Sequence, residues 1–257
     1  MKCVILAGGK GTRLAEETIV RPKPMVEIGG RPILWHIMKT YAHYGVKDFI
    51  ICLGYKGYMI KEYFANYFLH NADVVVDVSK GTIDYVDQRS DPWRIYLIDT
   101  GEETQTGGRL KRVARFLTPG EPFYFTYGDG LCDIDIAAET EFHRSHRLLG
   151  TVATVHPPAR FGNIVTDGVK VTRFEEKPQA DQGRINGGFF ILQPEVIDLI
   201  GGDEVSWERF PMEELSRRGQ LAAYQHNGFW QPMDTLREKL LLQSLWETGR
   251  APWKKWA

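Results

Sequence analysis

A glycine-rich turn close to the start of the chain constrains its fold more than any other feature. The apolar run from Cys3 to Ala7 is long enough for one buried strand, and three glycines follow it within four residues. Glycine permits backbone turns that other residues resist, and it leaves amide N–H groups uncovered. Exposed N–H groups at the end of a strand form a concavity that binds anions. Because Arg13 and Lys23 add two cations, the segment from Leu6 to Met25 is predicted to bind a polyphosphate.

Two better-known phosphate-binding motifs do not fit this turn. Leu14 stands where the dinucleotide-binding fingerprint needs its third glycine. No G-x-x-x-x-G-K-[ST] run occurs in the sequence, which excludes the P-loop. A tight connection from strand to helix, with a solvated arginine and lysine, remains the alternative for an isolated G-G-x-G.

Length, charge and cysteine content set wide bounds on the class of protein. A chain of 257 residues can bury one large α/β core or two small domains. Its formal net charge of −1 argues against a nucleic-acid-binding protein, which is usually plainly basic. The three cysteines show no C-x-x-C spacing, and those in apolar runs are expected to be reduced and buried. The sequence shows no signal peptide and no membrane-length apolar run, so we expect a cytoplasmic protein without a membrane partner.

Strand and helix patterns alternate along much of the chain. Such alternation predicts an α/β fold with a Rossmann-like, mixed but mostly parallel sheet and helices on both faces. In the second half, a hairpin with Asp167 and Gly168 at its turn predicts a small β-rich portion. The aromatic stripe of a helix at 57–68 is expected to lie in the core. Strands are predicted at 3–7, 48–53, 74–78, 82–86, 94–99, 123–127, 151–156 and 169–174, and helices at 32–44, 57–68 and 136–146.

A second candidate for phosphate binding lies between residues 99 and 116. Two glycines, Gly107 and Gly108, precede a helix-like run, so free amides again point out of a helix start. A cluster of cations follows, formed by Arg109, Lys111, Arg112 and Arg115. Because most charged helix faces are simply solvated, roughly half of these cations are expected to have no ligand.

Asp129 and Asp234 are the candidate metal ligands. Asp129 lies between glycines where an apolar strand ends, which is where α/β sheets bind ligands. Carboxylate oxygens suit Mg²⁺, which usually takes one or two carboxylates plus substrate phosphates. An ordinary turn aspartate at 129 and a helix N-cap at 234 remain the alternatives.

The remaining polar residues suggest no nucleophile. No Ser-His-Asp or Cys-His arrangement is visible. Asp133 and Asp135 are interpreted as caps and surface charges of the helix at 136–146. The histidines are interpreted as surface residues: His36, His43, His70, His143 and His146.

The motifs taken together are more specific than any one of them. G-G-x-G-T-R-L, a spacer and P-K-P-M are followed by V-E-I-G-G-R-P-I-L, and the second half contains E-E-K-P and I-N-G-G-F-F. This pattern resembles the sugar-1-phosphate nucleotidylyltransferases over nearly the whole chain. The resemblance implies a single nucleotidyltransferase domain over 1–257, with a nucleotide-binding half (1–135) and a sugar-phosphate-binding half (136–257).

The resemblance also implies roles for individual residues that bind the nucleotide. Arg13, Lys23 and Asp129 would be catalytic, with Arg13 on the leaving phosphates and Lys23 on a reacting phosphate. Asp129 and Asp234 would hold Mg²⁺. The nucleotide would contact Leu6, Ala7, Gly8, Gly9, Lys10, Gly11, Thr12, Arg13, Lys23, Thr104, Arg109 and Gly128.

For the second substrate, the resemblance implies that Lys177 meets the phosphate of a sugar 1-phosphate, while Glu176 and Asn186 bind sugar hydroxyls. T-G-G-R-L-K-R at 106–112 is similar to the version in members of the family that use CTP and glucose 1-phosphate. We therefore expect these two substrates, with CDP-glucose for deoxysugar pathways and pyrophosphate as products. UTP or dTTP, another sugar 1-phosphate, or a sensor without turnover remain the alternatives.

The sequence also favours association between copies of the chain. The tail that contains Trp253 and Trp256, and the insertion at 79–99, carry more apolar residues than loops usually do. The two tryptophans are expected to pack against the domain or against a neighbouring subunit. We expect a homo-oligomer, and the resemblance implies a hexamer.

Overall fold

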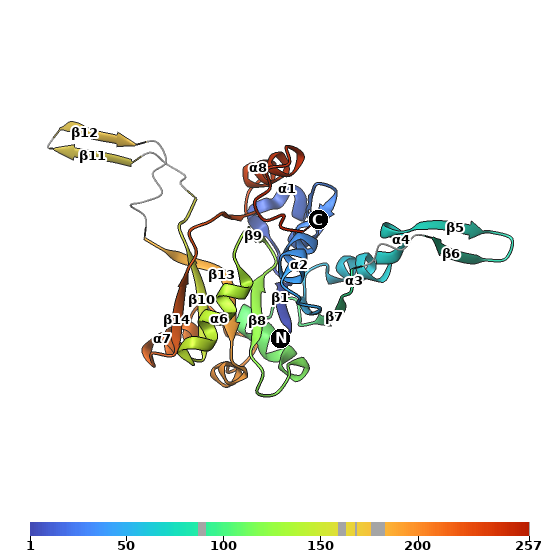
Figure 1. Cartoon of the computed structure of the whole chain (residues 1–257), viewed down its shortest axis with the longest axis horizontal. Coiled ribbons are helices and arrows are strands. Elements are labelled where there is room, and N and C mark those ends of the chain that lie inside the picture. Colours follow the sequence, from blue (N-terminus) through green and yellow to red (C-terminus); the bar gives the residue numbers. More distant parts are fainter. Residues whose placement is uncertain (87–90, 159–162, 168, 176–182, 257) are drawn as a thin grey trace.

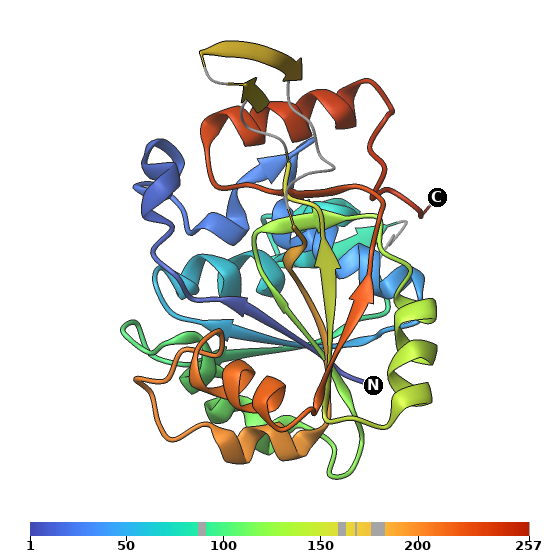
Figure 2. The same ribbon diagram turned by 90° about the vertical axis from the view of Figure 1, so that its left-hand side faces the viewer.

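The computed structural model describes the chain except for residues 87–90, 159–162, 168, 176–182 and 257. A central sheet with helices on both sides forms the body of the molecule, and two hairpins, β5–β6 and β11–β12, extend away from it in different directions (Figure 1). The view turned by 90° shows the strands of the sheet fanning out between the helical layers (Figure 2).

The main sheet has seven strands in the order β14-β10-β13-β8-β1-β4-β7. β1 (Cys3–Ala7) runs parallel to both of its neighbours, β4 and β8. β13 (Ile185–Leu192) runs antiparallel to the strands on either side of it. The predicted mixed, mostly parallel sheet is therefore confirmed. The other strands of this sheet are β4 (Asp48–Leu53), β7 (Arg94–Asp99), β8 (Phe123–Tyr127), β10 (Gly150–Val155) and β14 (Leu221–Gln225).

Helices cover both faces of the sheet. All five residues of β1 are buried, which explains why its sequence is apolar without alternation. Cys3 and Ile5 belong to the core on one face, whereas Val4 and Leu6 belong to the core on the other. The first core is completed by α2 (Ile33–His43), α3 (Gly57–Ala65), α6 (Ile136–His146) and α8 (Leu236–Glu247), and the second by α5 (Thr106–Val113), η4 (Pro194–Leu199) and α7 (Phe210–Arg217).

Shorter elements complete the described part of the chain. They are η1 (Thr12–Leu14), α1 (Ala15–Thr18), η2 (Lys23–Met25), β2 (Glu27–Ile28), β3 (Arg31–Pro32), α4 (Tyr67–Asn71), β5 (Asp73–Asp77), β6 (Thr82–Val86), η3 (Ala114–Phe116), β9 (Gly130–Cys132), β11 (Asn163–Asp167), β12 (Lys170–Glu175) and β15 (Trp230–Pro232).

Two elements differ from their predicted form. The run at 74–78 gives β5, which pairs with β6 in a separate two-stranded sheet and not with the main sheet. The helix predicted at 57–68 is divided into α3 and α4 at Asn66, whose side chain donates to Glu62 O. The aromatic stripe is therefore only partly core: Tyr67 is buried, but Phe68 is 48% exposed.

The surface placement of two histidines is wrong. His36 is fully buried, and its ring bonds Ile28 O at 2.8 Å and accepts from Trp253 Nε1 at 3.3 Å. His143 is also buried, and its Nδ1 lies 2.8 Å from Thr151 Oγ1. Burial lowers the pKa of each ring to about 4, so both are neutral core residues. Their partners come from segments distant in the sequence, which periodicity along one helix does not reveal.

The end of the chain packs against the body of the protein. Trp253 is fully buried and stacks on Phe229 with ring centroids 5.6 Å apart.

Asp135 caps α6 as predicted, because its Oδ1 accepts from Ala138 N at 3.0 Å. Within the described residues, no helix combines the length and the hydropathy that spanning a membrane would need.

Glu139 on α6 is a buried carboxyl group without a hydrogen-bond partner among the described residues. Burial raises its pKa to about 8. In the unfolded chain the same group titrates near its ordinary pKa of about 4.3. Because only the unfolded state ionises between these two values, Glu139 favours folding below about pH 4, and this contribution declines as the pH rises towards 8.

We predict that Glu139→Gln stabilises the protein at pH 8 and has little effect at pH 4.5. Ionisation of Glu139 in the unfolded state lowers the free energy of unfolding by about 1.4 kcal/mol for each pH unit between the two pKa values, and the variant removes this loss of a few kcal/mol. Urea denaturation of both proteins at several pH values measures the difference. Glu141→Gln, an exposed position two residues further along the same helix, is the control. Parallel stability curves for the wild type and Glu139→Gln would contradict the prediction.

Candidate active site

A cavity of about 1030 Å³ opens at the carboxyl ends of β1 and β8, where parallel strands of α/β sheets bind ligands. Segments from several distant parts of the chain line it. They include residues 6–13 with Lys23 and Pro24, residues 102–106 with Arg109, the turn at 127–129, and Pro157, Pro158, Ile185, Asn186, Trp230, Pro232 and Asp234.

The glycine turn forms one wall of this cavity, and we call residues 8–13 the glycine cradle. At Gly8 a Cβ atom would lie 2.1 Å from Arg109 Nη1 and 2.9 Å from Gly54 N, so no larger residue fits there. Gly11 has a φ of +62°, a conformation that side chains disfavour. Gly9 has open space around it. The cradle therefore needs glycine for packing at one position and for backbone shape at another.

Two aspartates and two cations converge beside the cradle. Lys23 Nζ donates to Asp129 Oδ2 at 2.7 Å and to Asp234 Oδ1 at 2.6 Å. Arg13 Nη1 donates to Asp234 Oδ2 at 2.8 Å. Lys23 is 7% exposed, whereas the Arg13 side chain remains 73% exposed. The four groups carry balanced charges, which offsets the cost of burying Lys23.

The pKa of Lys23 reports the balance between burial and charge. Burial alone would lower this pKa, but the two carboxylates outweigh it and hold the pKa above its ordinary value. Lys23 is therefore a protonated donor at neutral pH, as a phosphate-binding role requires.

The helix that follows Asp234 explains why its carboxylate is free to face the cavity. The N-cap of α8 is Thr235, whose side chain accepts from Glu238 N in a full capping box. Glu238 Oε2 in turn accepts from Asp234 N at 2.7 Å. The alternative that Asp234 is itself the N-cap is therefore wrong.

Asp129 and Asp234 have the chemistry of a divalent-cation site. Lys23 Nζ contacts one oxygen of Asp129 and one oxygen of Asp234, so the distance between these two oxygens cannot exceed the sum of the two contact distances. Two carboxylates at such spacing, open to a cavity with room for phosphates, fit the ligand set of Mg²⁺. The structure thus brings together the two residues that the sequence singled out.

Arg109 lines the cavity, but its guanidinium group donates hydrogen bonds to other groups of the protein. It is 4% exposed, and burial lowers its pKa. Its Nη1 donates to Leu53 O, Thr100 Oγ1 and Gly101 O at 3.0, 2.9 and 2.7 Å, and its Nη2 to Gly8 O and Glu102 O at 3.2 and 3.0 Å. The geometry favours a brace behind the cradle. Thr104, by comparison, is 9% exposed and also lines the cavity.

The opposite wall belongs to the predicted sugar-binding half. Asn186 lines the cavity, and its Oδ1 accepts from Gly188 N at 2.7 Å. Glu176 and Lys177 lie outside the described residues. The roles implied for these three residues stay predictions, as does the division of the chain at residue 135.

Sequence reasoning missed Tyr127 in the wall of the cavity and Glu208, which contacts it. Tyr127 lines the cavity and donates to Glu208 Oε1 at 2.7 Å. Glu208 also accepts from Thr106 Oγ1 at 2.6 Å, which ties the wall to the start of α5. Tyr127 stands directly before Gly128 and could have been found from its position at the strand end. Nothing near Glu208 in the sequence signals its place.

The chain is similar to known proteins over most or all of its length. A sequence model described as "Nucleotidyl transferase" matches residues 2–214. The glucose-1-phosphate cytidylyltransferase of Salmonella typhi is 57% identical over 256 residues, covering 100% of each chain. The probable glucose-1-phosphate cytidylyltransferase of Bacillus subtilis (strain 168) is 41% identical over 257 residues, with the same coverage. The crystal structure of HddC from Yersinia pseudotuberculosis has a similar fold, with a TM-score of 0.69 at 24% identity over 95% of this chain and 99% of that one.

We predict that Arg109→Met destabilises the protein by more than about 3 kcal/mol, because it strands several buried acceptors that each cost about 1–3 kcal/mol. Urea denaturation measures the loss of stability, and calorimetric titration with a nucleoside triphosphate measures the affinity of the glycine cradle for the nucleotide. Arg115→Met, an exposed arginine in the same segment, is the control. Unchanged stability in Arg109→Met, with lost nucleotide binding, would instead make Arg109 a direct ligand.

Proposed function

Since the chain belongs to the nucleotidyl transferase family, we infer that it is a glucose-1-phosphate cytidylyltransferase. It transfers CMP from CTP to glucose 1-phosphate and releases CDP-glucose and pyrophosphate. The observation that carries this conclusion is the 57% identity to the Salmonella typhi enzyme over the full length of both chains. The cavity beside the glycine cradle, with its cations and carboxylates, is the place in this chain that suits the reaction.

Such a reaction asks the protein chiefly for positioning and charge neutralisation. The sugar phosphate oxygen attacks the α-phosphorus of CTP in line and expels pyrophosphate, so no protein nucleophile is needed. The cradle amides and the exposed guanidinium of Arg13 hold the leaving β- and γ-phosphates. Lys23, which is protonated and lies between the carboxylates, holds the α-phosphate.

Asp129 and Asp234 are the residues that would hold Mg²⁺. Bound there, Mg²⁺ would supply charge neutralisation at the phosphate oxygens. The second phosphate-binding cation is Lys177, which is assigned by the family resemblance alone. We also assign Asn186, which lines the same cavity, to the sugar hydroxyls, because these need paired donors and acceptors when water is excluded.

We also assign a homo-oligomer, with the hexamer as the expected form. In support, the β5–β6 hairpin exposes large apolar side chains, among them Val75 (57% exposed), Val76 (55%) and Ile83 (48%). Exposed apolar surface of this kind is typical of contacts between subunits. Light scattering in solution tests this assignment, and the mass of a single chain would contradict it.

Pyrophosphate release across a panel of nucleoside triphosphates and sugar 1-phosphates tests the function. We expect release with CTP and glucose 1-phosphate to exceed every other pair by at least about tenfold in kcat/KM. Equal turnover with UTP or dTTP would contradict the base assignment. Intact ligand binding without turnover on any pair would make the protein a sensor.

We predict that Asp129→Asn and Asp234→Asn each lower kcat by roughly a thousandfold or more, because each removes charge from the proposed cation site. Thermal denaturation and circular dichroism verify that each variant folds. Asp135→Asn is the matched control, because asparagine caps a helix about as well as aspartate does. Turnover near that of the control in either variant would show that its carboxylate has no metal role.

A further inference from the structure

Both candidate metal ligands lie at one end of a short ribbon formed by β9 and β15. Asp129 directly precedes β9, and Asp234 follows β15 by two residues. The strands are antiparallel, with Gly130 opposite Pro232, and Met233 N donates to Asp129 O at 2.8 Å. The ribbon thus brings the two aspartates side by side. A ribbon of two short strands is only marginally stable alone, so its geometry depends on what holds it.

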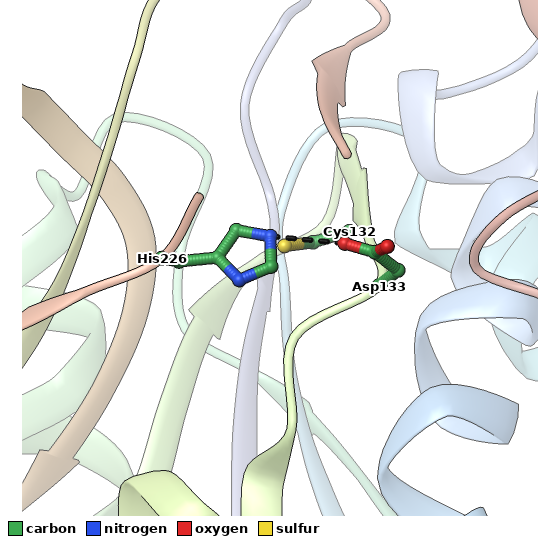
Figure 3. A group of neighbouring side chains, drawn as sticks. All are labelled: Cys132, Asp133 and His226. Atoms are coloured by element: carbon green, nitrogen blue, oxygen red, sulfur yellow. Dashed lines mark ion pairs between the residues drawn. The ribbon is translucent and has the colours of Figure 1, made fainter. Parts of the chain in front are cut away.

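The far end of this ribbon is closed by a polar contact between Asp133 and His226, which we call the clasp. His226 Nε2 lies 3.0 Å from Asp133 Oδ1 and 3.2 Å from Phe229 O. Figure 3 shows the imidazole facing the carboxylate, with the Cys132 thiol close to both. The backbone closes the same end, because Asp133 N donates to Phe229 O at 3.1 Å. Asp133 Oδ1 is buried and has no hydrogen-bond partner within the described residues, so its contact with His226 is a close polar approach and not a directed hydrogen bond.

The clasp also ties the ribbon to the main sheet. His226 directly follows β14, and its N–H donates to Thr154 O of β10 at 2.9 Å. Arg184 Nη1 donates to His226 O and to Thr154 O, each at 3.1 Å. One partner of the clasp is therefore anchored in the sheet, while the other, Asp133, is four residues from Asp129.

Cysteine, aspartate and histidine are residue types that ligate metals. In this group, the ligand atoms of Cys132, Asp133 and His226 also lie within 4.8 Å of one another, so a metal site is the alternative to the clasp. Two observations favour the clasp. The Phe229 carbonyl can only accept, so Nε2 carries a proton and donates. Burial raises the pKa of the Cys132 thiol well above its ordinary value. Both groups would have to lose protons before binding a metal.

We propose that Asp133 and His226 are positioning residues for the reaction: their contact fixes the distal end of the β9–β15 ribbon and thereby sets Asp129 and Asp234 at the spacing needed to share one divalent cation. This inference rests on the proposed function of the site. Neither residue touches the reacting atoms.

Gly228 allows the clasp to be opened without deleting either partner. A Cβ atom at this position would lie 2.3 Å from Asp133 Oδ1 and 2.7 Å from His226 Cε1. These atoms are the ends of side chains, so Gly228→Ala should push the two side chains apart while the backbone stays in place. No glycine-specific φ is involved at this residue.

The test compares His226→Ala, Asp133→Ala and Gly228→Ala with the wild type and with His226→Gln, whose amide can still donate. Mn²⁺ binding in the presence of CTP is measured by electron paramagnetic resonance, and kcat and KM are measured separately. We expect the first three variants to bind Mn²⁺ about 10–100-fold more weakly and to lose kcat to a similar degree. The KM for glucose 1-phosphate stays near the wild-type value, and His226→Gln recovers most of the loss.

Lys39→Met is the matched control. Lys39 pairs with Asp91 at 2.9 Å, the two side chains are 20% and 18% exposed, and neither belongs to the ribbon. This variant should lower the thermal midpoint without changing Mn²⁺ affinity. Clasp variants that behave like Lys39→Met would reduce the clasp to a stabilising contact and overturn the proposal.

Two further outcomes have distinct meanings. Stoichiometric zinc in the purified wild type that disappears in Cys132→Ala would make the group a metal site and overturn the clasp. A wild type that turns over a different nucleoside triphosphate would contradict the proposed function only. The same Mn²⁺ measurements with that nucleotide would then still decide whether the clasp positions the aspartates.

Discussion

The ammonium group of Lys23, shared by Asp129 and Asp234, is the interaction on which the site depends. A buried charge is tolerated only when its partners are fixed around it, and removing one partner of a buried pair costs about 3–5 kcal/mol. Here the three charges come from residues more than 100 positions apart in the sequence. The whole fold must therefore be assembled before this cluster can exist.

The parallel strands supply that assembly. β1 and β8 are hydrogen-bonded neighbours, so the glycine cradle after one and the Gly128–Gly130 turn after the other meet at the same edge of the sheet. Arg109 fills the space behind Gly8 and binds carbonyl groups from several loops. The capping box of α8 leaves the Asp234 carboxylate facing the cavity. The glycine cradle, Arg109 and the capping box of α8 each limit the movement of groups that contact the substrates, and catalysis by positioning requires such rigidity.

The sequence predicted most where local chemistry dominates. Fully buried strands such as β1 can be predicted because every residue is apolar. The glycine turn and Asp129 can be predicted because each follows such a strand. What long-range packing decides was not predictable. The hydrogen bonds that Arg109 makes to Leu53, Gly8 and residues 100–102 could not be predicted from its own segment, and its contact with the nucleotide stays a prediction. His143 was interpreted as a surface residue because its partners Thr151 and Gln193 lie outside its helix.

Two other differences have causes of different kinds. The T-L-R-E run at 235–238 is a capping-box signature, so the sequence already contained the evidence against an N-cap at Asp234. By contrast, β5 has the apolar pattern of a sheet strand, and only its pairing with β6 shows that it lies outside the main sheet. Hydropathy tells that a strand buries a face, but not against which surface.

The most direct test is anomalous diffraction from crystals soaked with Mn²⁺ and a non-hydrolysable CTP analogue. We expect one strong peak between the carboxylates of Asp129 and Asp234, beside the α-phosphate, with the triphosphate lying along the glycine cradle. A peak elsewhere, or a triphosphate that does not touch residues 8–13, would contradict the proposed roles of the two aspartates and the cradle.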